Sequence, residues 1–336
     1  MRKEAMLWEK MDGNRVHCYL CAHHCRIEDG SFGFCGMRKN EGGALYTYAY
    51  GEVIASHVDP IEKKPLYHFL PGTFAYSIAT IGCNFRCPFC QNWNISQVSA
   101  RDGGLEGYEL KPQEVIREAE KAGCRSISYT YTEPTIFFEY AYDTAKLAHE
   151  KGLKNTFVTN GYMTKKAIDE IKPYLDAANV DLKFFKEESY RDVCKATLQP
   201  VLDSIKYMKE IGIWVEVTTL VIPGSNDSDE ELDKIARFIA KTGTDIPWHV
   251  TRFHPDYQVT DKEATPADTI KRAIRIGRKN RLKYVYPGNV MLGGSTACPG
   301  CGAHLVERAG FVAEFTGNFS GGKCTKCGAA IEGVWE

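Results

Sequence analysis

This 336-residue chain has no long apolar run, almost no net charge and no glycine-rich dinucleotide-binding fingerprint. No stretch approaches the ~18 apolar residues of a transmembrane helix. The nearest, residues 213–222, is interrupted by Glu216 and two threonines. A formal net charge of −1 gives nucleic acid or a membrane surface little to attract. Residues 1–10 carry charges at both ends and lack the apolar core of a signal peptide, so we expect a cytoplasmic protein.

Cysteine, by contrast, is plentiful, with thirteen in the chain. Without an export signal, so many cysteines favour metal sites over disulfides. Only Cys124 and Cys194 stand alone. The others form three groups: Cys18, Cys21, Cys25 and Cys35; Cys83, Cys87 and Cys90; and Cys298, Cys301, Cys324 and Cys327. Metal sites require such clustering, whereas disulfides do not.

The central group follows an apolar run over residues 74–81. Its three cysteines, Cys83, Cys87 and Cys90, cannot all pair with one another, and a structural zinc site normally has four protein ligands. A [4Fe-4S] cluster held by three cysteines keeps one iron without a protein ligand. That iron can bind a substrate or cofactor, so we predict an iron–sulfur site here.

The two terminal groups each offer four thiolates. Near the N-terminus, a segment too small to bury much apolar surface suggests that a metal replaces a core. The spacing of Cys18, Cys21, Cys25 and Cys35 fits neither ferredoxin pattern, which favours zinc and leaves a second iron–sulfur cluster as the alternative. The paired knuckles Cys298-x2-Cys301 and Cys324-x2-Cys327 predict a zinc ribbon.

Between these segments, strand-like and helical patterns alternate. Strands are expected at 74–81, 126–131, 154–158, 177–182, 213–222 and 248–253, with a last one at 283–286. Helices are expected at 112–122, 134–151, 164–175, 189–211 with a break at Pro200, 228–242, and 267–279 capped by Thr265-Pro266; a glycine-rich connection covers 102–107. Six strand–helix units predict a parallel sheet with helices outside, arranged as a partial (β/α)6-type TIM-like barrel. We therefore divide the chain into an N-terminal metal-binding segment with four cysteines (1–64), the barrel (65–290) and the ribbon (291–336).

In a parallel α/β barrel, reactive groups lie at the carboxyl ends of the strands. Polar or turn-forming residues follow every expected strand, and we predict that they converge on one mouth. They are Asn92, after the cysteine loop; Thr132 and Glu133; Thr159 and Asn160; Asp181 and Lys183; Pro223 and Gly224; and His254. Each alone is also an ordinary turn residue, so the prediction depends on their coincidence with the cysteine loop.

An amino acid chelating the open iron would present an amine and a carboxylate to this mouth. Glu133 is suited to accept from the amine, and Lys183 and Asn92 to hold the carboxylate. Asp181 and Thr159 are suited to bind a ribose hydroxyl or a small cation.

An aromatic base on the same ligand would need apolar contacts. Phe89, between two of the cysteines, is suited to pack on such a base, and His254 to close over it.

These residues together resemble a known family. Cys83-x3-Cys87-x-Phe89-Cys90 resembles the radical S-adenosylmethionine (SAM) signature. Over residues 75–260 the resemblance is greatest to the glycyl-radical-enzyme activases, such as pyruvate formate-lyase activating enzyme. Thr132-Glu133-Pro134 resembles their Gly-Gly-Glu-Pro, with Tyr131 and Thr132 at the glycine positions.

Three further segments extend this resemblance. Val158-Thr159-Asn160-Gly161 resembles the activases' Asp-Thr-Asn-Gly, with Val158 in place of an acid. Asp181-Leu182-Lys183 and His254 match their methionine-side and adenine-side positions. Cys90-Gln91-Asn92 resembles their Cys-His-Asn, with Gln91 as the departure.

Residues 55–68, together with the N-terminal cysteines, resemble the AmmeMemoRadiSam branch, which is associated with Memo-like and AMMECR-type proteins. The resemblance implies reductive cleavage of SAM at a [4Fe-4S] cluster to a 5′-deoxyadenosyl radical that abstracts hydrogen. It also implies a low-potential electron donor of the ferredoxin or flavodoxin type. The substrate is a protein glycine, as for the activases, or a small molecule.

A second hypothesis is a non-catalytic multi-zinc protein that binds a partner protein or nucleic acid. The two terminal cysteine groups favour it. The near-neutral charge and the six strand–helix units disfavour it, because phosphate binding requires a basic face.

Overall fold

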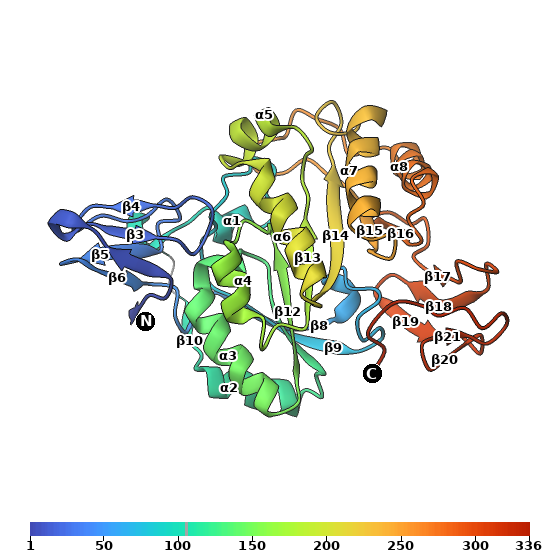
Figure 1. Ribbon diagram of the computed structural model, residues 1–336, viewed down its shortest axis with the longest axis horizontal. Helices are drawn as coiled ribbons and strands as arrows, with labels where there is room; N and C mark the ends of the chain where they lie inside the picture. The colour runs from blue at the N-terminus through green and yellow to red at the C-terminus, as the bar shows by residue number, and fades with distance from the viewer. Residues whose placement is uncertain (105–106) are drawn as a thin grey trace.

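The protein was analysed as a computed structural model that describes residues 1–104 and 107–336. Residues 105–106 of the predicted glycine-rich connection lie outside the described residues. Figure 1 shows a central α/β part with the N-terminal strands at one end of the long axis and the C-terminal strands at the other. Nowhere in the described ranges does a helix have the length and apolar character needed to cross a membrane.

The central sheet has eight strands in the order β16-β15-β14-β13-β12-β11-β9-β8. Their bounds are Ala55–Pro60 (β8), Phe74–Ala79 (β9), Ser126–Tyr129 (β11), Lys154–Thr159 (β12), Ala177–Asp181 (β13), Trp214–Val221 (β14), Trp248–Arg252 (β15) and Val285–Gly288 (β16). Every neighbouring pair from β9 to β16 is parallel, which confirms the predicted α/β fold with a mostly parallel sheet. All the carboxyl ends of these strands therefore lie along one edge.

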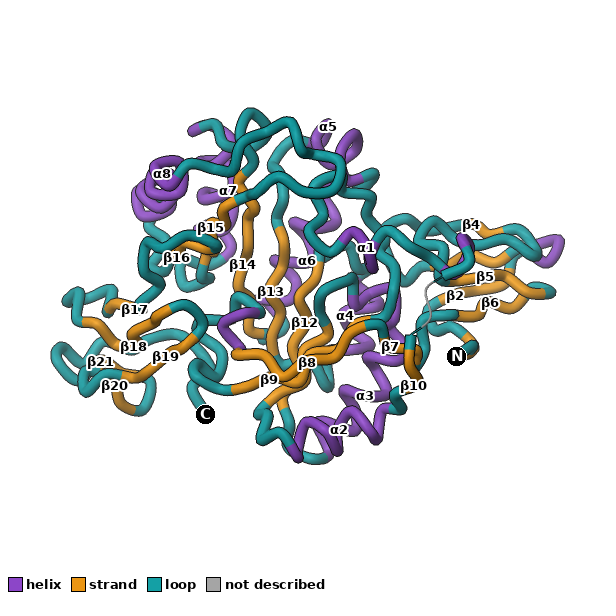
Figure 2. The backbone as a smooth tube through the Cα atoms, turned by 180° about the vertical axis from the view of Figure 1, so that it is seen from behind, coloured by secondary structure: helices purple, strands orange, loops and turns teal. Residues whose placement is uncertain are grey.

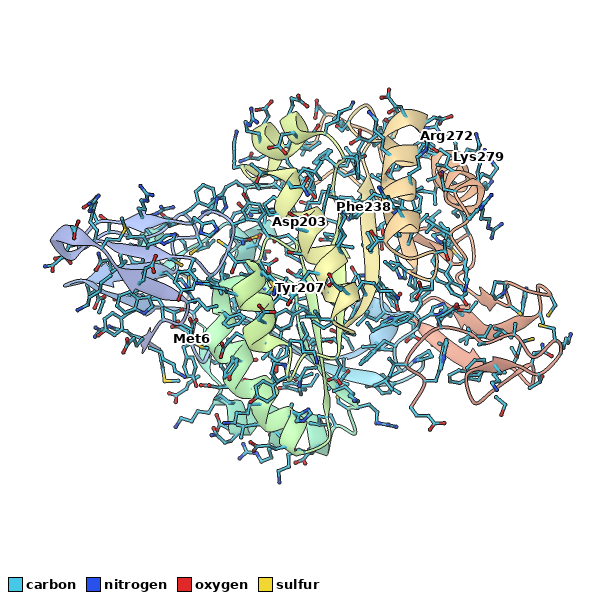
Figure 3. The ribbon with its side chains drawn as sticks, viewed as in Figure 1. Met6, Asp203, Tyr207, Phe238, Arg272 and Lys279 are labelled. Carbon is cyan, nitrogen blue, oxygen red and sulfur yellow. The ribbon has the colours of Figure 1, made fainter. Side chains whose placement is uncertain are left out.

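Seen from behind, the strands stand in front of the helices, so the helices cover one face of the sheet (Figure 2). The main helices are α2 (Pro112–Lys121), α3 (Phe138–Glu150), α4 (Lys165–Ile171), α6 (Leu198–Glu210), α7 (Asp229–Thr242) and α8 (Ala267–Lys279), with short α1 (Trp93–Ser96) and α5 (Glu187–Ser189). Asp203 and Tyr207 project from α6, and Arg272 and Lys279 from α8 (Figure 3). Gly277 allows α8 to approach the sheet closely, because a Cβ atom there would lie 3.0 Å from the Trp248 ring.

Small antiparallel sheets make up the two ends. The N-terminal strands are β1 (Lys3–Glu4), β2 (Trp8–Lys10), β3 (Val16–Cys18), β4 (Arg26–Ile27), β5 (Arg38–Glu41), β6 (Ala44–Thr47) and β7 (Glu52–Val53), and β7 pairs with β10 (Tyr108–Glu109). The C-terminal strands are β17 (Thr296–Ala297), β18 (His304–Ala309), β19 (Val312–Phe315), β20 (Phe319–Ser320) and β21 (Lys323–Cys324). Short 3-10 or π turns occupy Asp12–Asn14, Ile61–Lys63, Ala100–Asp102, Pro134–Phe137 and Tyr190–Cys194.

The structure departs from the sequence-based expectations in three places. Strand β8 pairs antiparallel with β9, so the central sheet begins before residue 65. The expected helix over 189–211 is interrupted at Lys195 (φ +58°), and Pro200 lies in the first turn of α6, where its missing N–H costs no helical hydrogen bond. Thr265 does not cap α8; its hydroxyl donates to the Val221 carbonyl and so ties the loop to β14.

Candidate functional site

A cavity of about 1040 Å³ opens at the carboxyl ends of the parallel strands. Most of the residues predicted from the sequence line it: Cys83, Cys87, Phe89, Cys90, Asn92, Thr132, Glu133, Thr159, Asn160, Asp181 and Lys183. The structure does not bring Pro223, Gly224 or His254 to this cavity. His254 is exposed beyond the end of β15, and the wall next to that strand is instead formed by His249, Thr251 and Arg252.

The three central cysteines occupy the loop after β9 and share one wall of the cavity. The backbone N–H of Phe85 donates to Cys83 Sγ over 3.3 Å, and Cys90 Sγ lies 3.1 Å from the Ser96 hydroxyl. Burial raises the pKa of both thiols. Three convergent sulfurs beside open space fit a [4Fe-4S] cluster that retains one iron for another ligand.

Glu133 is buried at the start of the turn after β11, and burial raises the pKa of its carboxyl group. Its Oε1 accepts from the backbone N–H of Thr135 at 3.0 Å and from the Thr159 hydroxyl at 2.7 Å. Its Oε2 accepts from the backbone N–H of Asn160 at 2.8 Å. Oε2 therefore has lone-pair capacity left for a donor in the cavity.

Lys183 and Asp181, at the end of β13, form an ion pair with Nζ 2.9 Å from Oδ2. Burial lowers the pKa of Lys183, but the negative charges of the Asp181 carboxylate and of Cys87 as a thiolate outweigh it, so the pKa lies well above its ordinary value. The lysine is therefore a fixed cation on the cavity wall, 17% exposed. Such a cation suits a carboxylate ligand.

The asparagines of the site hold the loops in place. Asn160 Nδ2 donates to Asn84 Oδ1 over 2.7 Å and so ties the β12 end to the cysteine loop. Asn92 Nδ2 donates to the Tyr131 carbonyl over 2.8 Å. Thr132 donates its hydroxyl to the Thr80 carbonyl. Three neighbouring strand ends are thus joined to one another.

The Phe89 ring is buried in the same wall. It packs edge-on against Phe184, with the ring centroids 6.0 Å apart. The ring thereby adds an apolar contact to the cavity lining, to which Phe85 and Leu220 also belong.

Lys64 and Tyr131 also line the cavity, and sequence reasoning did not single them out as site residues. Lys64 is buried, donates to Asp59 over 2.6 Å and lies 4.5 Å over the Tyr131 ring. Burial lowers the pKa of Lys64 to about 8 despite this ion pair. No local pattern marks Lys64, because its partners come from β8 and from the turn after β11.

The C-terminal strands supply the far wall through residues 309–311 and Arg308. Arg308 is buried and donates to the Tyr67 carbonyl at 2.6 Å and to the Thr296 hydroxyl at 2.7 Å. Its Nε lies 3.8 Å from the buried Glu62 carboxylate. The cavity is therefore enclosed by both the central sheet and the C-terminal part.

The terminal cysteine groups are both gathered in space. The thiols of Cys298, Cys301, Cys324 and Cys327 all lie within 4.8 Å of one another and can hold a metal ion. Cys18, Cys21, Cys25 and Cys35 line a second, much smaller pocket. Arg38 and Ile136 are part of its wall.

Comparison with known proteins identifies the class. The family model for the Radical SAM superfamily matches residues 77–239. An uncharacterised protein of Methanocaldococcus jannaschii is 45% identical over 334 residues, 98% of this chain and 99% of its own. The pyruvate formate-lyase-activating enzyme of Clostridium pasteurianum is 23% identical over 212 residues, 57% of this chain and 84% of its own.

A solved structure agrees at the level of the fold. Streptococcus suis SuiB bound to S-adenosylmethionine superposes with a TM-score of 0.51 at 16% identity, over 69% of this chain and 53% of that chain. The chain belongs to the Radical SAM superfamily and is a radical SAM enzyme. This confirms the predicted superfamily and replaces the hypothesis of a non-catalytic zinc protein.

Proposed function

We propose that this enzyme cleaves SAM reductively at a [4Fe-4S] cluster held by Cys83, Cys87 and Cys90. The observation that supports it is the shared cavity, in which the three thiols face the polar strand ends. When bound, the reduced cluster supplies one electron to SAM, which separates into methionine and a 5′-deoxyadenosyl radical that abstracts hydrogen from the substrate. The protein's own residues bind the cluster and SAM, orient them and exclude water.

The amino-acid half of SAM fits the charged side of the cavity. The free lone pairs of Glu133 Oε2 would accept from its amine, and the Lys183 ammonium would pair with its carboxylate. Asn92 would add a donor to that carboxylate once its bond to the Tyr131 carbonyl is exchanged.

The ribose needs hydrogen-bond acceptors for its hydroxyls, and the adenine needs apolar contacts. Asp181 and Thr159 would bind the ribose hydroxyls, and Phe89 would pack on the adenine. Thr132 and Asn160 would act by holding the strand ends, through their bonds to Thr80 and Asn84. For Pro223, Gly224 and His254 the cavity offers no such support.

The substrate class that we propose is a protein, as for the activases, with an electron donor of the ferredoxin or flavodoxin type. The name of the relative from C. pasteurianum supports an activating reaction. A cavity of about 1040 Å³ leaves room beside SAM for a segment of a partner chain. The sequence resemblance adds Memo-like and AMMECR-type proteins as candidate partners.

We further propose that the central sheet is the partial barrel of this superfamily, flanked by the N-terminal segment with four cysteines (1–64), whose strand β8 joins the edge of that sheet, and by a zinc ribbon (291–336). For the ribbon, the Sγ–Sγ distances of 3.5 Å for Cys298–Cys327 and 3.7 Å for Cys301–Cys324 support zinc. Thiolates ~2.3 Å from a tetrahedral zinc lie roughly 3.8 Å from one another.

Anaerobic reconstitution tests the proposed reaction. The wild type, reduced with dithionite, should convert SAM to 5′-deoxyadenosine, measured by liquid chromatography. The triple variant Cys83→Ala/Cys87→Ala/Cys90→Ala should produce none. Cys124→Ala is the matched control, because Cys124 is a buried cysteine outside the cavity. Undiminished 5′-deoxyadenosine from the triple variant would show that the proposal is wrong.

A further inference from the structure

The three cysteine groups differ in how far apart their sulfurs stand. The C-terminal thiols all lie within 4.8 Å of one another. Among residues 1–104 and 107–336, no other three cysteines meet that limit. The N-terminal group is therefore more widely spaced, although Cys18, Cys21, Cys25 and Cys35 all line one pocket.

This spacing separates two kinds of metal centre. A single tetrahedral zinc requires its four sulfurs roughly 3.8 Å apart. A [4Fe-4S] cluster binds each thiolate on a separate iron, which places the sulfurs roughly 6 Å apart. The central cysteines Cys83, Cys87 and Cys90 share the wider arrangement, and they are the cluster ligands in the function proposed above.

The surroundings of the N-terminal pocket also suit an anionic, water-excluded group. Leu20, Ile27 and Ile136 give it an apolar wall. The backbone N–H of Phe34 donates to Cys25 Sγ over 3.4 Å. Hydrogen bonds to the ligand sulfurs and low solvent exposure are two of the means by which proteins tune iron–sulfur clusters.

Arg38 supplies a buried positive charge in the same wall. It is 2% exposed, donates from Nη1 to Cys18 Sγ over 3.4 Å and forms an ion pair with Glu139. Its Nε is buried and has no hydrogen-bond partner among the described residues. A buried donor without a partner is costly unless an acceptor is present, and a thiolate-ligated cluster provides one.

We infer that Cys18, Cys21, Cys25 and Cys35 hold a second [4Fe-4S] cluster. Because all four irons then have a protein ligand, this cluster has no open iron and cannot bind SAM. The inference concerns occupancy alone and rests on the proposed function only for the comparison with the central loop.

The second cluster would lie next to the loop of the first. His23 Nε2 is 2.7 Å from the Asn84 carbonyl, and its ring packs on Phe34 with centroids 4.1 Å apart. Arg86 donates from Nη2 to the Phe34 carbonyl and from Nη1 to the Cys83 carbonyl, each over 2.7 Å. The segment between the N-terminal cysteines is thus fastened directly to the central cysteine loop.

Metal and sulfide analysis of Cys83→Ala/Cys87→Ala/Cys90→Ala, prepared anaerobically, tests the inference. We expect about four irons and four sulfides per chain, and an electron paramagnetic resonance signal after reduction that SAM does not change. The wild type should contain about eight irons. A Cys298→Ser/Cys301→Ser variant is the matched control and should keep all its iron while losing zinc.

The reverse variant guards against a folding artefact. Cys18→Ala/Cys25→Ala should retain about four irons whose spectrum responds to SAM. The inference is overturned if the triple variant binds no iron, or binds a second zinc, while the wild type holds about four irons and still cleaves SAM. That result would leave the proposed function standing. If the wild type holds about eight irons but does not cleave SAM, the second cluster is supported and the proposed function is wrong.

Discussion

Replacing Glu133 by glutamine tests whether this carboxylate receives the amine of SAM. In the structure, Oε1 accepts from Thr135 and Thr159, whereas Oε2 accepts only from the Asn160 backbone. In Glu133→Gln, the oxygen would remain on the Oε1 side, where most donors converge. The new amide NH2 group would then face the Asn160 N–H on one side and the SAM amine on the other. Both are hydrogen-bond donors, so the amide could accept from neither.

The magnitude follows from these contacts. A hydrogen bond to a charged group contributes about 1.5–3 kcal/mol, so losing the amine contact should weaken SAM binding by about 10- to 100-fold. The Asn160 N–H loses its buried acceptor, which should cost about 1–3 kcal/mol of the free energy of unfolding. Binding and stability should therefore both fall.

Anaerobic equilibrium titration gives the Kd for SAM, and urea unfolding gives the stability. Glu231→Gln is the matched control, because Glu231 is also fully buried, accepts from the Phe185 backbone at 2.5 Å and lies outside the cavity. It should lose stability and keep its affinity for SAM. A folded Glu133→Gln protein whose Kd stays within about twofold of the wild type would refute the assignment.

Three other predictions concern the C-terminal part. Burial lowers the pKa of His68 to about 4. Between pH 6.5 and pH 4 the unfolded chain binds a proton at this ring and the folded chain does not, so about 3 kcal/mol of the unfolding free energy should be lost as the pH falls to 4. The unfolding free energy of His68→Gln, measured in urea, should lack that part of the pH dependence. If its pH dependence equals that of the wild type, groups other than His68 are responsible. Arg308→Ala should lower the unfolding free energy by about 3–5 kcal/mol because Glu62 then remains as an unpaired buried charge. Adding Glu62→Gln should recover part of the loss, and strict additivity would contradict this coupling. Removing metal with a chelator should lower the thermal midpoint of the wild type but not of Cys301→Ser, as followed by calorimetry and zinc analysis.

The central strands could be predicted from the sequence because each is a short apolar or β-branched run that ends at a turn residue. The strand expected at 213–222 is β14, Trp214–Val221, and that expected at 248–253 is β15, Trp248–Arg252. Strand β8 was missed because its residues are mostly half-buried or exposed, so Ala55–Pro60 has no apolar face to reveal it. β8 pairs with the backbone groups that β9 leaves free on its outer side, and the sequence of β8 alone does not show this.

The candidate site also contains residues that could be predicted from the sequence and residues that could not. Glu133 and Lys183 follow strands directly, so their convergence could be predicted from a parallel sheet alone. Arg308 reaches Tyr67 across 241 residues of sequence, and no local pattern records such a contact. His254 also follows a strand, but its side chain is exposed and lies outside the cavity, so that position at a strand end did not suffice.

Two parts of the chain line one cavity, so SAM binding and the choice of substrate can depend on different residues. The cysteine loop and the strand ends, where SAM would bind, lie in the region that matches the superfamily model. Other lining residues, 287–291, 293–294 and 308–311, lie outside that region. A change in the C-terminal strands can therefore alter which molecule is admitted without touching the residues that would generate the radical. The C-terminal strands would in this way influence the choice of substrate separately from the site of radical formation.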